Sequence, residues 1–359
     1  ERERAIDASE QSLKDFLSAI QASPNGVVLL DAQTQIEWCN QTAADQLGID
    51  SKRDHMQRIG NLLRDPVFTA YMAQSDTSLS AVMEGRGSRS DRPVRISVQR
   101  HRYGDGKQLL LTRDVTLMEQ AEAMRRDFVA NVSHEIRTPL TVLSGFVETM
   151  QTLDLAGDDR QRYLSLMATQ AHRMQTLVDD LLTLSRLEGS PVPGFHHELP
   201  LTRLMKACEQ EAQGLSASLS ADGHVQTIAF VIDEALGHSV LLGETRELQS
   251  ALSNLVSNAV RYTPADGRIQ VSAQRSADGG LQIEVQDSGA GIAAEHLPRL
   301  TERFYRVDRS RSRESGGTGL GLAIVKHVMQ RHGGSLAISS VLGQGSSFRL
   351  LFPAARWRV

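Results

Sequence analysis

Cysteine is scarce in this sequence, and neither a long apolar run nor an excess of positive charge is present. The two cysteines, Cys39 and Cys208, have no second Cys or His at metal-ligand spacing. A disulfide framework and a structural zinc site are therefore excluded, and a reducing compartment is expected. No stretch approaches the ~20 apolar residues of a membrane span. A formal net charge of -4 provides no surplus of cations for polyanions, so direct nucleic-acid binding is not expected.

The composition is otherwise typical of a globular chain. Hydrophobic residues make up 40% and charged residues 23% of the sequence, which excludes bulk disorder and fibrous structure. The length of 359 residues, at about 150 residues per domain, predicts two or three domains. We predict a multidomain α+β protein whose parts cover residues 1–116, 117–189 and 195–359.

The first part, residues 1–116, combines a short helix with strands. An amphipathic helix is predicted over residues 12–21. Strand-like runs separated by turn residues are predicted at 26–31, 35–39, 94–99 and 108–112. This pattern predicts a small α+β domain with an antiparallel sheet.

The second part, residues 117–189, contains two long helical patterns, at 117–153 and 159–188. Together they predict a helical hairpin. Each pattern carries an apolar stripe at steps of three and four residues. Two facing stripes leave further apolar side chains uncovered, namely Phe128, Phe146, Leu177 and Leu184. Pairing two hairpins into a four-helix homodimer would bury them.

The third part follows a linker of glycine and proline at residues 189–194. Strands are predicted at 226–232, 239–242, 268–273, 281–286, 335–339 and 347–352, with helices at 245–261 and 318–332. Alternating strands and helices predict an α/β layered domain.

His134 lies on the first hairpin helix, about 200° around the helix from Val132 in the apolar stripe. It should therefore face solvent, together with Thr138 one turn later. An exposed imidazole is largely neutral near pH 7 and has a lone pair for nucleophilic attack. Pro139 should bend the helix just past it. An isolated histidine of this kind is usually an ordinary surface residue. Whether His134 is a nucleophile must therefore be judged from the residues around it.

The neighbours form the string FVANVSHEIRTPL at residues 128–140. This string resembles the phosphoacceptor box of sensor histidine kinases. By the resemblance, His134 takes the γ-phosphoryl group of ATP and Glu135 accepts the proton of His134. Thr138 would help to position the water that removes phosphate from the partner protein, a response regulator.

Three motifs in the third part suggest a nucleotide site. Asn254 and Asn258 lie four apart on one helix face. DSGAG at 287–291 closes a strand, and GGTGLG at 316–321 opens a helix. Glycine at a helix entry lets backbone N–H groups hold phosphate. The spacing fits neither a P-loop nor a Rossmann site.

In this order, the motifs resemble the ATP-binding domain of histidine kinases, which is related to the ATP module of DNA gyrase. The resemblance implies that Asn258 coordinates Mg²⁺, Asp287 accepts the adenine amino group and Tyr262 packs near the base. Residues 306–315 resemble a lid over the phosphates. The other nucleotide contacts it implies are Asn254, Arg261, Gly289, Gly291, Arg313, Gly317, Thr318, Gly319, Leu320 and Gly321.

Asn254 separates two reaction classes. Related ATPases have a water-activating glutamate at this position, whereas an amide cannot act as a base. ATP should therefore be kept for His134. Arg261 stands where many relatives have Lys, which keeps the charge.

Residues 1–116 resemble a PAS sensor module through their strand pattern and short segments such as NQTAA at 40–44.

These resemblances predict an ATP-dependent, homodimeric histidine kinase that phosphorylates a response regulator and also dephosphorylates it. A sensor kinase for another stimulus, a non-catalytic nucleotide-binding scaffold and an ATP-hydrolysing clamp are the alternatives. The chain begins at Glu1 without Met. We expect membrane spans upstream of Glu1 and a cytoplasmic location for this portion, where ATP and the regulator are available.

Overall fold

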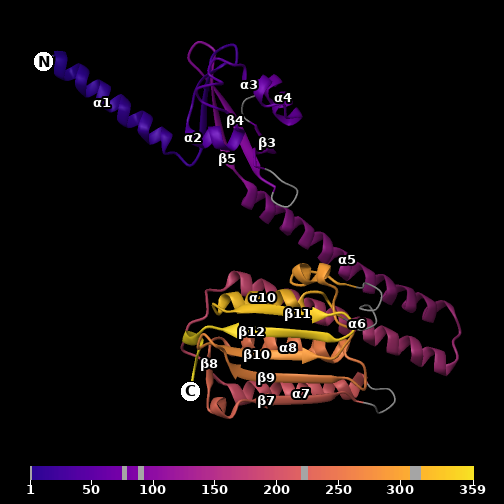
Figure 1. The fold of residues 1–359 in the computed structure, drawn as a ribbon. Coiled ribbons are helices and arrows are strands. Elements are labelled where there is room, and N and C mark those ends of the chain that lie inside the picture. Colours follow the sequence, from indigo (N-terminus) through magenta and orange to yellow (C-terminus); the bar gives the residue numbers. More distant parts are fainter. Residues whose placement is uncertain (1, 75–78, 88–92, 220–224, 308–316) are drawn as a thin grey trace. The chain divides into compact units, whose positions relative to one another are not determined.

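The computed structural model describes residues 2–74, 79–87, 93–219, 225–307 and 317–359. The chain forms two compact units, residues 1–130 and 131–359 (Figure 1). Each is described by itself. The predicted α+β class is confirmed. The predicted division into three parts stays a prediction.

The first unit contains a five-stranded antiparallel sheet in the order β2-β1-β5-β4-β3. Its strands are β1 (Gly26–Leu30), β2 (Ile36–Cys39), β3 (Ser80–Glu84), β4 (Arg95–Tyr103) and β5 (Lys107–Asp114). Its helices are α1 (Arg2–Gln21), α2 (Gln41–Leu47), α3 (Ile59–Leu62) and α4 (Pro66–Ala73). The four predicted strands are confirmed, whereas β3 and α2 to α4 were not predicted. The helix predicted from residue 12 begins at Arg2.

Asn40 connects three elements of this unit and is fully buried. Its side-chain oxygen accepts hydrogen bonds from the backbone N–H groups of Val27 and Ala43, so it caps α2. Its amide nitrogen donates to the carbonyls of Ile20 and Asn25. A buried amide is tolerated here because its polar atoms have partners.

The predicted hairpin is confirmed as α5 (Thr116–Thr152) and α6 (Gly157–Gly189). Pro139 lies inside α5. The expectation that Leu177 and Leu184 need a second copy to be covered is wrong, because both are buried within one chain. The described element that α6 contacts most is α10 (Gly321–Arg331) of the third part. Phe146 is half-buried, and its ring centroid lies 5.4 Å from that of Tyr163.

The remainder of the second unit is a helical layer on a mixed sheet in the order β11-β12-β10-β9-β7 (Figure 1). The strands are β7 (Thr227–Ile232), β9 (Arg268–Arg275), β10 (Leu281–Asp287), β11 (Ser335–Val341) and β12 (Gly345–Phe352). Only β7 and β9 pair in parallel among these described strands. A smaller sheet joins β6 (Glu198–Pro200), β8 (Val240–Leu242) and β13 (Trp357–Arg358).

Three helices, α7 (Leu201–Leu219), α8 (Thr245–Tyr262) and α10, pack beside one another on the large sheet. Burial alternates along β10, so one side of the strand faces this layer. The predicted α/β layering is confirmed, although α7 was not predicted. The helix predicted from residue 318 begins at Gly321, because Gly319 has a left-handed backbone with φ +74°.

Leu350 of β12 offers a test of this core, because it is 1% exposed, while Leu342 in the turn between β11 and β12 is 68% exposed. Leu350→Ala should lower the opening free energy of β10 to β12 by about 2–5 kcal/mol, since it leaves a cavity. Leu342→Ala, the matched control, should change it by less than about 0.5 kcal/mol. Hydrogen–deuterium exchange of the full chain measures both. Equal effects would show that the sheet face is misassigned.

Candidate functional site

His134 lies exposed on α5, as its helical position predicts. The hydroxyl of Thr138 donates a hydrogen bond to the His134 carbonyl at 3.1 Å. This bond places Thr138 one turn beyond the histidine, on the same face. His172 of α6 is also exposed.

Glu135 is half-buried and pairs with a residue that the sequence did not reveal. Its Oε2 accepts a hydrogen bond from Nη2 of Arg173 on α6, at 3.2 Å. The side chains are 32% and 15% exposed, respectively. The acid next to His134 is therefore fixed by a cation from the other helix of the hairpin.

Asn254 and Asn258 lie on α8 and are both half-buried. The amide nitrogen of Asn254 donates to the Ser250 carbonyl at 2.8 Å. Its amide oxygen would lie only 2.5 Å from a Cβ on Gly321, so the asparagine side chain packs against the start of α10. The side chain of Asn258 forms no hydrogen bond within the part of the chain that the structure describes.

Asp287 ends β10 and is 8% exposed. Burial raises the pKa of its carboxyl group, and backbone hydrogen bonds from Gly289 and Ser346 oppose that increase. Gly289 approaches the end of α8, because a Cβ there would lie 2.5 Å from the Tyr262 carbonyl oxygen. Gly291 has φ +66°, and its Cβ would lie 2.1 Å from the Val341 carbonyl oxygen.

The glycine-rich segment returns to the same region. A Cβ on Gly317 would lie 3.8 Å from the Tyr262 hydroxyl. The Gly319 carbonyl accepts a hydrogen bond from the Phe304 N–H at 2.9 Å. Leu320 is fully buried, and its N–H donates to the Thr318 hydroxyl at 3.2 Å. The structure therefore brings together Asn254, Tyr262, Asp287 and the two glycine segments.

Two predicted arginines have different outcomes. Arg261 is half-buried near the end of α8 and has an interaction partner. Arg313 lies outside the described residues, as do residues 308–315 of the predicted lid. The lid therefore stays a prediction.

Thr318 contacts the hairpin. Its hydroxyl donates to Oδ2 of Asp180 on α6 at 2.6 Å. Burial raises the pKa of the Asp180 carboxyl group, and this hydrogen bond lowers it in part. An ion pair between Arg303 and Glu188 adds a second contact to α6. The predicted nucleotide segment is thus attached to the phosphoacceptor hairpin in this structure.

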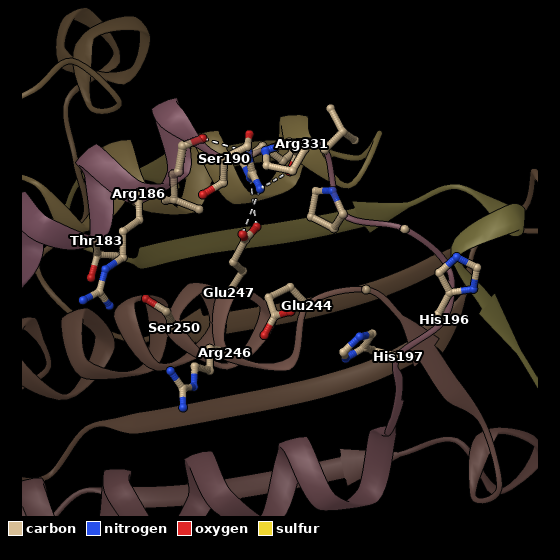
Figure 2. A pocket seen from close by; sticks show the side chains of 16 residues that line it. Thr183, Arg186, Ser190, His196, His197, Glu244, Arg246, Glu247, Ser250 and Arg331 are labelled. Carbon is tan, nitrogen blue, oxygen red and sulfur yellow. Dashed lines mark hydrogen bonds and ion pairs between the residues drawn. The ribbon is translucent and has the colours of Figure 1, made fainter.

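Arg331 of α10 holds the linker that joins the hairpin to the third part (Figure 2). Its guanidinium donates to the carbonyls of Leu187, Ser190 and Pro191, each at 2.8 Å. It also binds both carboxylate oxygens of Glu247 on α8 at 3.0 Å. The adjoining pocket of about 580 Å³ is lined by this linker, α6 and the start of α8. None of the predicted nucleotide residues lines that pocket.

Three family models match the chain. Residues 14–80 match a PAS domain, residues 124–190 match the His Kinase A (phospho-acceptor) domain, and residues 243–356 match the histidine kinase-, DNA gyrase B- and HSP90-like ATPase family. The matched segments contain His134 and the asparagine and glycine motifs. No described helix is both long enough and apolar enough to cross a membrane.

Curated relatives match over almost the whole chain. The phosphate regulon sensor protein PhoR of Pseudomonas aeruginosa is 44% identical over 337 residues, covering 92% of this chain and 72% of the relative. The sensor-like histidine kinase SenX3 of Mycolicibacterium smegmatis is 34% identical, covering 98% and 88%. Among solved structures, the histidine kinase ThkA in complex with response regulator protein TrrA has a TM-score of 0.50 at 19% identity, covering 92% and 95%. That likeness shows the fold.

The chain therefore belongs to the sensor histidine kinases of two-component systems, and it is an ATP-binding protein-histidine kinase. Within this class it is similar to the phosphate regulon sensor proteins. The amino-acid sequences of residues 128–150 and 302–327 also resemble those of the phosphate-regulon sensor kinase.

Gly291 tests whether the glycine geometry forms the nucleotide site. Gly291→Ala would bring Cβ against a backbone carbonyl as well as straining a left-handed backbone, so ATP affinity should fall more than about tenfold. The matched control is Gly343→Ala, which has φ +79° but no atom within 4 Å of a Cβ. It should change affinity less than about threefold. Titration with a fluorescent ATP analogue measures both, and equal affinities would exclude this geometry.

Proposed function

We propose that this kinase transfers the γ-phosphoryl group of ATP to His134 and then to an aspartate of a response regulator. The observation that carries the proposal is the exposed imidazole of His134 beside the anchored carboxylate of Glu135. A neutral imidazole offers a lone pair on one ring nitrogen and carries a proton on the other. Both features suit nucleophilic attack with removal of a proton.

In the proposed step, each bond that forms or breaks and the proton that moves can be assigned. One nitrogen of His134 forms a bond to the γ-phosphorus while the bond from that phosphorus to the bridging oxygen breaks and ADP leaves. The proton of the other ring nitrogen passes to Glu135. The amide of Asn254 cannot take a proton from water, so the site favours transfer to His134 over hydrolysis.

The nucleotide roles are proposed from the family resemblance, and the arrangement on α8 and β10 supports them. Asp287, a buried acid, accepts the adenine amino group, and Tyr262 packs beside the base. Backbone N–H groups of Gly291 and of the glycines at 317, 319 and 321 hold phosphate. The N–H groups of Gly289 and Leu320 instead fix the loops, through Asp287 and Thr318. Asn254, Arg261 and, in the lid, Arg313 complete the polar surroundings of the nucleotide.

Asn258 has the chemistry required to hold Mg²⁺. Its amide is half-buried and has no hydrogen-bond partner among the described residues. Those residues also contain no group of three His, Cys, Asp or Glu side chains that could hold a metal alone. Mg²⁺ usually binds one or two protein oxygens and the phosphates of a substrate. Bound there, the ion would neutralise phosphate charge during transfer.

A homodimer is proposed from the surface of the hairpin. Large apolar side chains remain exposed on both helices within one chain: Val129, Leu140, Val147, Leu164, Val178 and Leu182. A second hairpin would cover such a surface by forming a four-helix bundle. Contiguous apolar surface of this kind is typical of an interface.

The regulator is proposed as the partner, and the phosphate regulon as the pathway, from the relatives. ThkA was solved with a response regulator protein, and the 44% identical relative is a phosphate regulon sensor protein. The alternative is the same enzyme with a different stimulus. Dephosphorylation of the regulator is proposed because the hydroxyl of Thr138 lies near the face that carries His134. The division into residues 1–116, 117–189 and 195–359 is proposed to separate sensing, phosphotransfer and ATP binding.

His134→Ala should abolish labelling by γ-labelled ATP with Mg²⁺, because the nucleophile is lost. Nucleotide affinity should stay within about twofold, since the nucleotide residues lie elsewhere. His172→Ala, which removes another exposed hairpin histidine, is the matched control and should label normally. The label in the parent chain should be labile to acid and stable to base. Labelling of His134→Ala would refute the assignment.

Thr138→Ala should slow dephosphorylation of the regulator about tenfold, a loss of about 1.4 kcal/mol, with a smaller effect on autophosphorylation. Thr149→Ala is the control, because its hydroxyl makes the same bond to the carbonyl four residues earlier, at 2.8 Å. Release of phosphate from the phosphorylated regulator gives the first rate and labelling of the kinase gives the second. Equal losses in both assays would contradict a water-positioning role.

A further inference from the structure

The ion pair between Arg173 and Glu135 has an unusual position. It joins two helices across 38 residues of sequence and places a guanidinium next to the acid that follows His134. Within the described part of the chain, it is the only ion pair between α5 and α6. Arg173 is 15% exposed, so its charge is largely removed from water.

The low exposure of Arg173 bears on how firmly it holds Glu135. Exposed ion pairs contribute little to stability because water screens them, whereas a largely buried cation must keep its partner. Arg173 therefore restrains Glu135 more firmly than a surface arginine would. A planar guanidinium also fixes the direction of a carboxylate better than a lysine ammonium does.

The contact uses only one of the two carboxylate oxygens. Oε2 is held by Arg173, and Oε1 has no partner among the residues that the structure describes. A glutamate side chain has several rotatable bonds, so an unrestrained carboxylate would sample many positions. With Oε2 fixed, Oε1 stays available for a proton from the neighbouring residue.

We infer that Arg173 is a positioning residue for the phosphorylation of His134. It holds Oε2 of Glu135 so that Oε1 receives the imidazole proton as the nitrogen–phosphorus bond forms and ADP leaves. The cation remains paired with the acid throughout and does not touch ATP. This inference rests on the proposed role of Glu135.

A double-mutant cycle in the full chain tests the inference. Initial rates of autophosphorylation are measured over a range of ATP concentrations with excess Mg²⁺. The variants are Arg173→Gln, Arg173→Lys, Glu135→Gln and the double variant Glu135→Gln with Arg173→Gln. Arg162→Gln, which removes an exposed arginine of the same helix, is the matched control.

Arg173→Gln should lower kcat about tenfold and leave the KM for ATP within about twofold, because the nucleotide residues are untouched. Arg173→Lys should recover most of the rate, since it restores the cation. Glu135→Gln should lose about 10²-fold or more. The double variant should be no slower than Glu135→Gln, because Arg173 acts through that acid. Arg162→Gln should match the parent.

Distinct results would overturn distinct claims. Full activity of Glu135→Gln would remove the proposed proton acceptor, and the inference with it. Full activity of Arg173→Gln, with Glu135→Gln impaired, would overturn the inference alone. A further rate loss in the double variant would show that Arg173 acts elsewhere. Loss of helical circular dichroism in Arg173→Gln would assign the ion pair to folding and would also overturn the positioning role.

Discussion

The contact between α6 and α10 holds the phosphoacceptor hairpin and the nucleotide-binding part in one unit. Its apolar component is the buried side of α6, formed by Leu177, Leu184 and Leu187. Polar contacts surround it, above all the hydrogen bond between Thr318 and Asp180. Because Thr318 belongs to the predicted phosphate-binding segment, attachment to the hairpin and binding of nucleotide use neighbouring atoms.

Backbone proximity shapes the nucleotide site more than side-chain chemistry does. Gly291 lies against Val341, and Gly321 lies against Asn254. At Gly291 the neighbouring atom is a backbone carbonyl oxygen, so only a residue without Cβ fits there, whereas at Gly321 it is the end of the Asn254 side chain. Most of the polar groups expected to bind ATP are therefore positioned by the path of the main chain, and side chains such as Asp287 are proposed to supply selectivity for the base.

Local patterns predicted the long elements well. Both hairpin helices agree with their predicted bounds within two residues, because the apolar period persists over many turns. Helix α7 was overlooked although Leu201, Leu204 and Cys208 mark its buried face. In the short edge strand β3 burial alternates, but its sequence SAVME holds three apolar residues in a row, so polar and apolar residues do not alternate along it. Burial of Leu184 and the pairing of Arg173 depend on contacts between elements distant in sequence, which single-sequence reasoning does not provide.

Two arginines, Arg331 and Arg356, bind the linker through its main-chain atoms. Arg331 binds three carbonyls, and Arg356 adds bonds to those of Pro193 and Gly194. Every amino acid has a carbonyl, so these bonds do not depend on the identity of the linker side chains. During evolution, this segment can change in composition while its attachment persists. The two arginines, in contrast, cannot be replaced by shorter or neutral residues without loss of these hydrogen bonds. Substitutions should therefore be tolerated along the linker but not at Arg331 and Arg356.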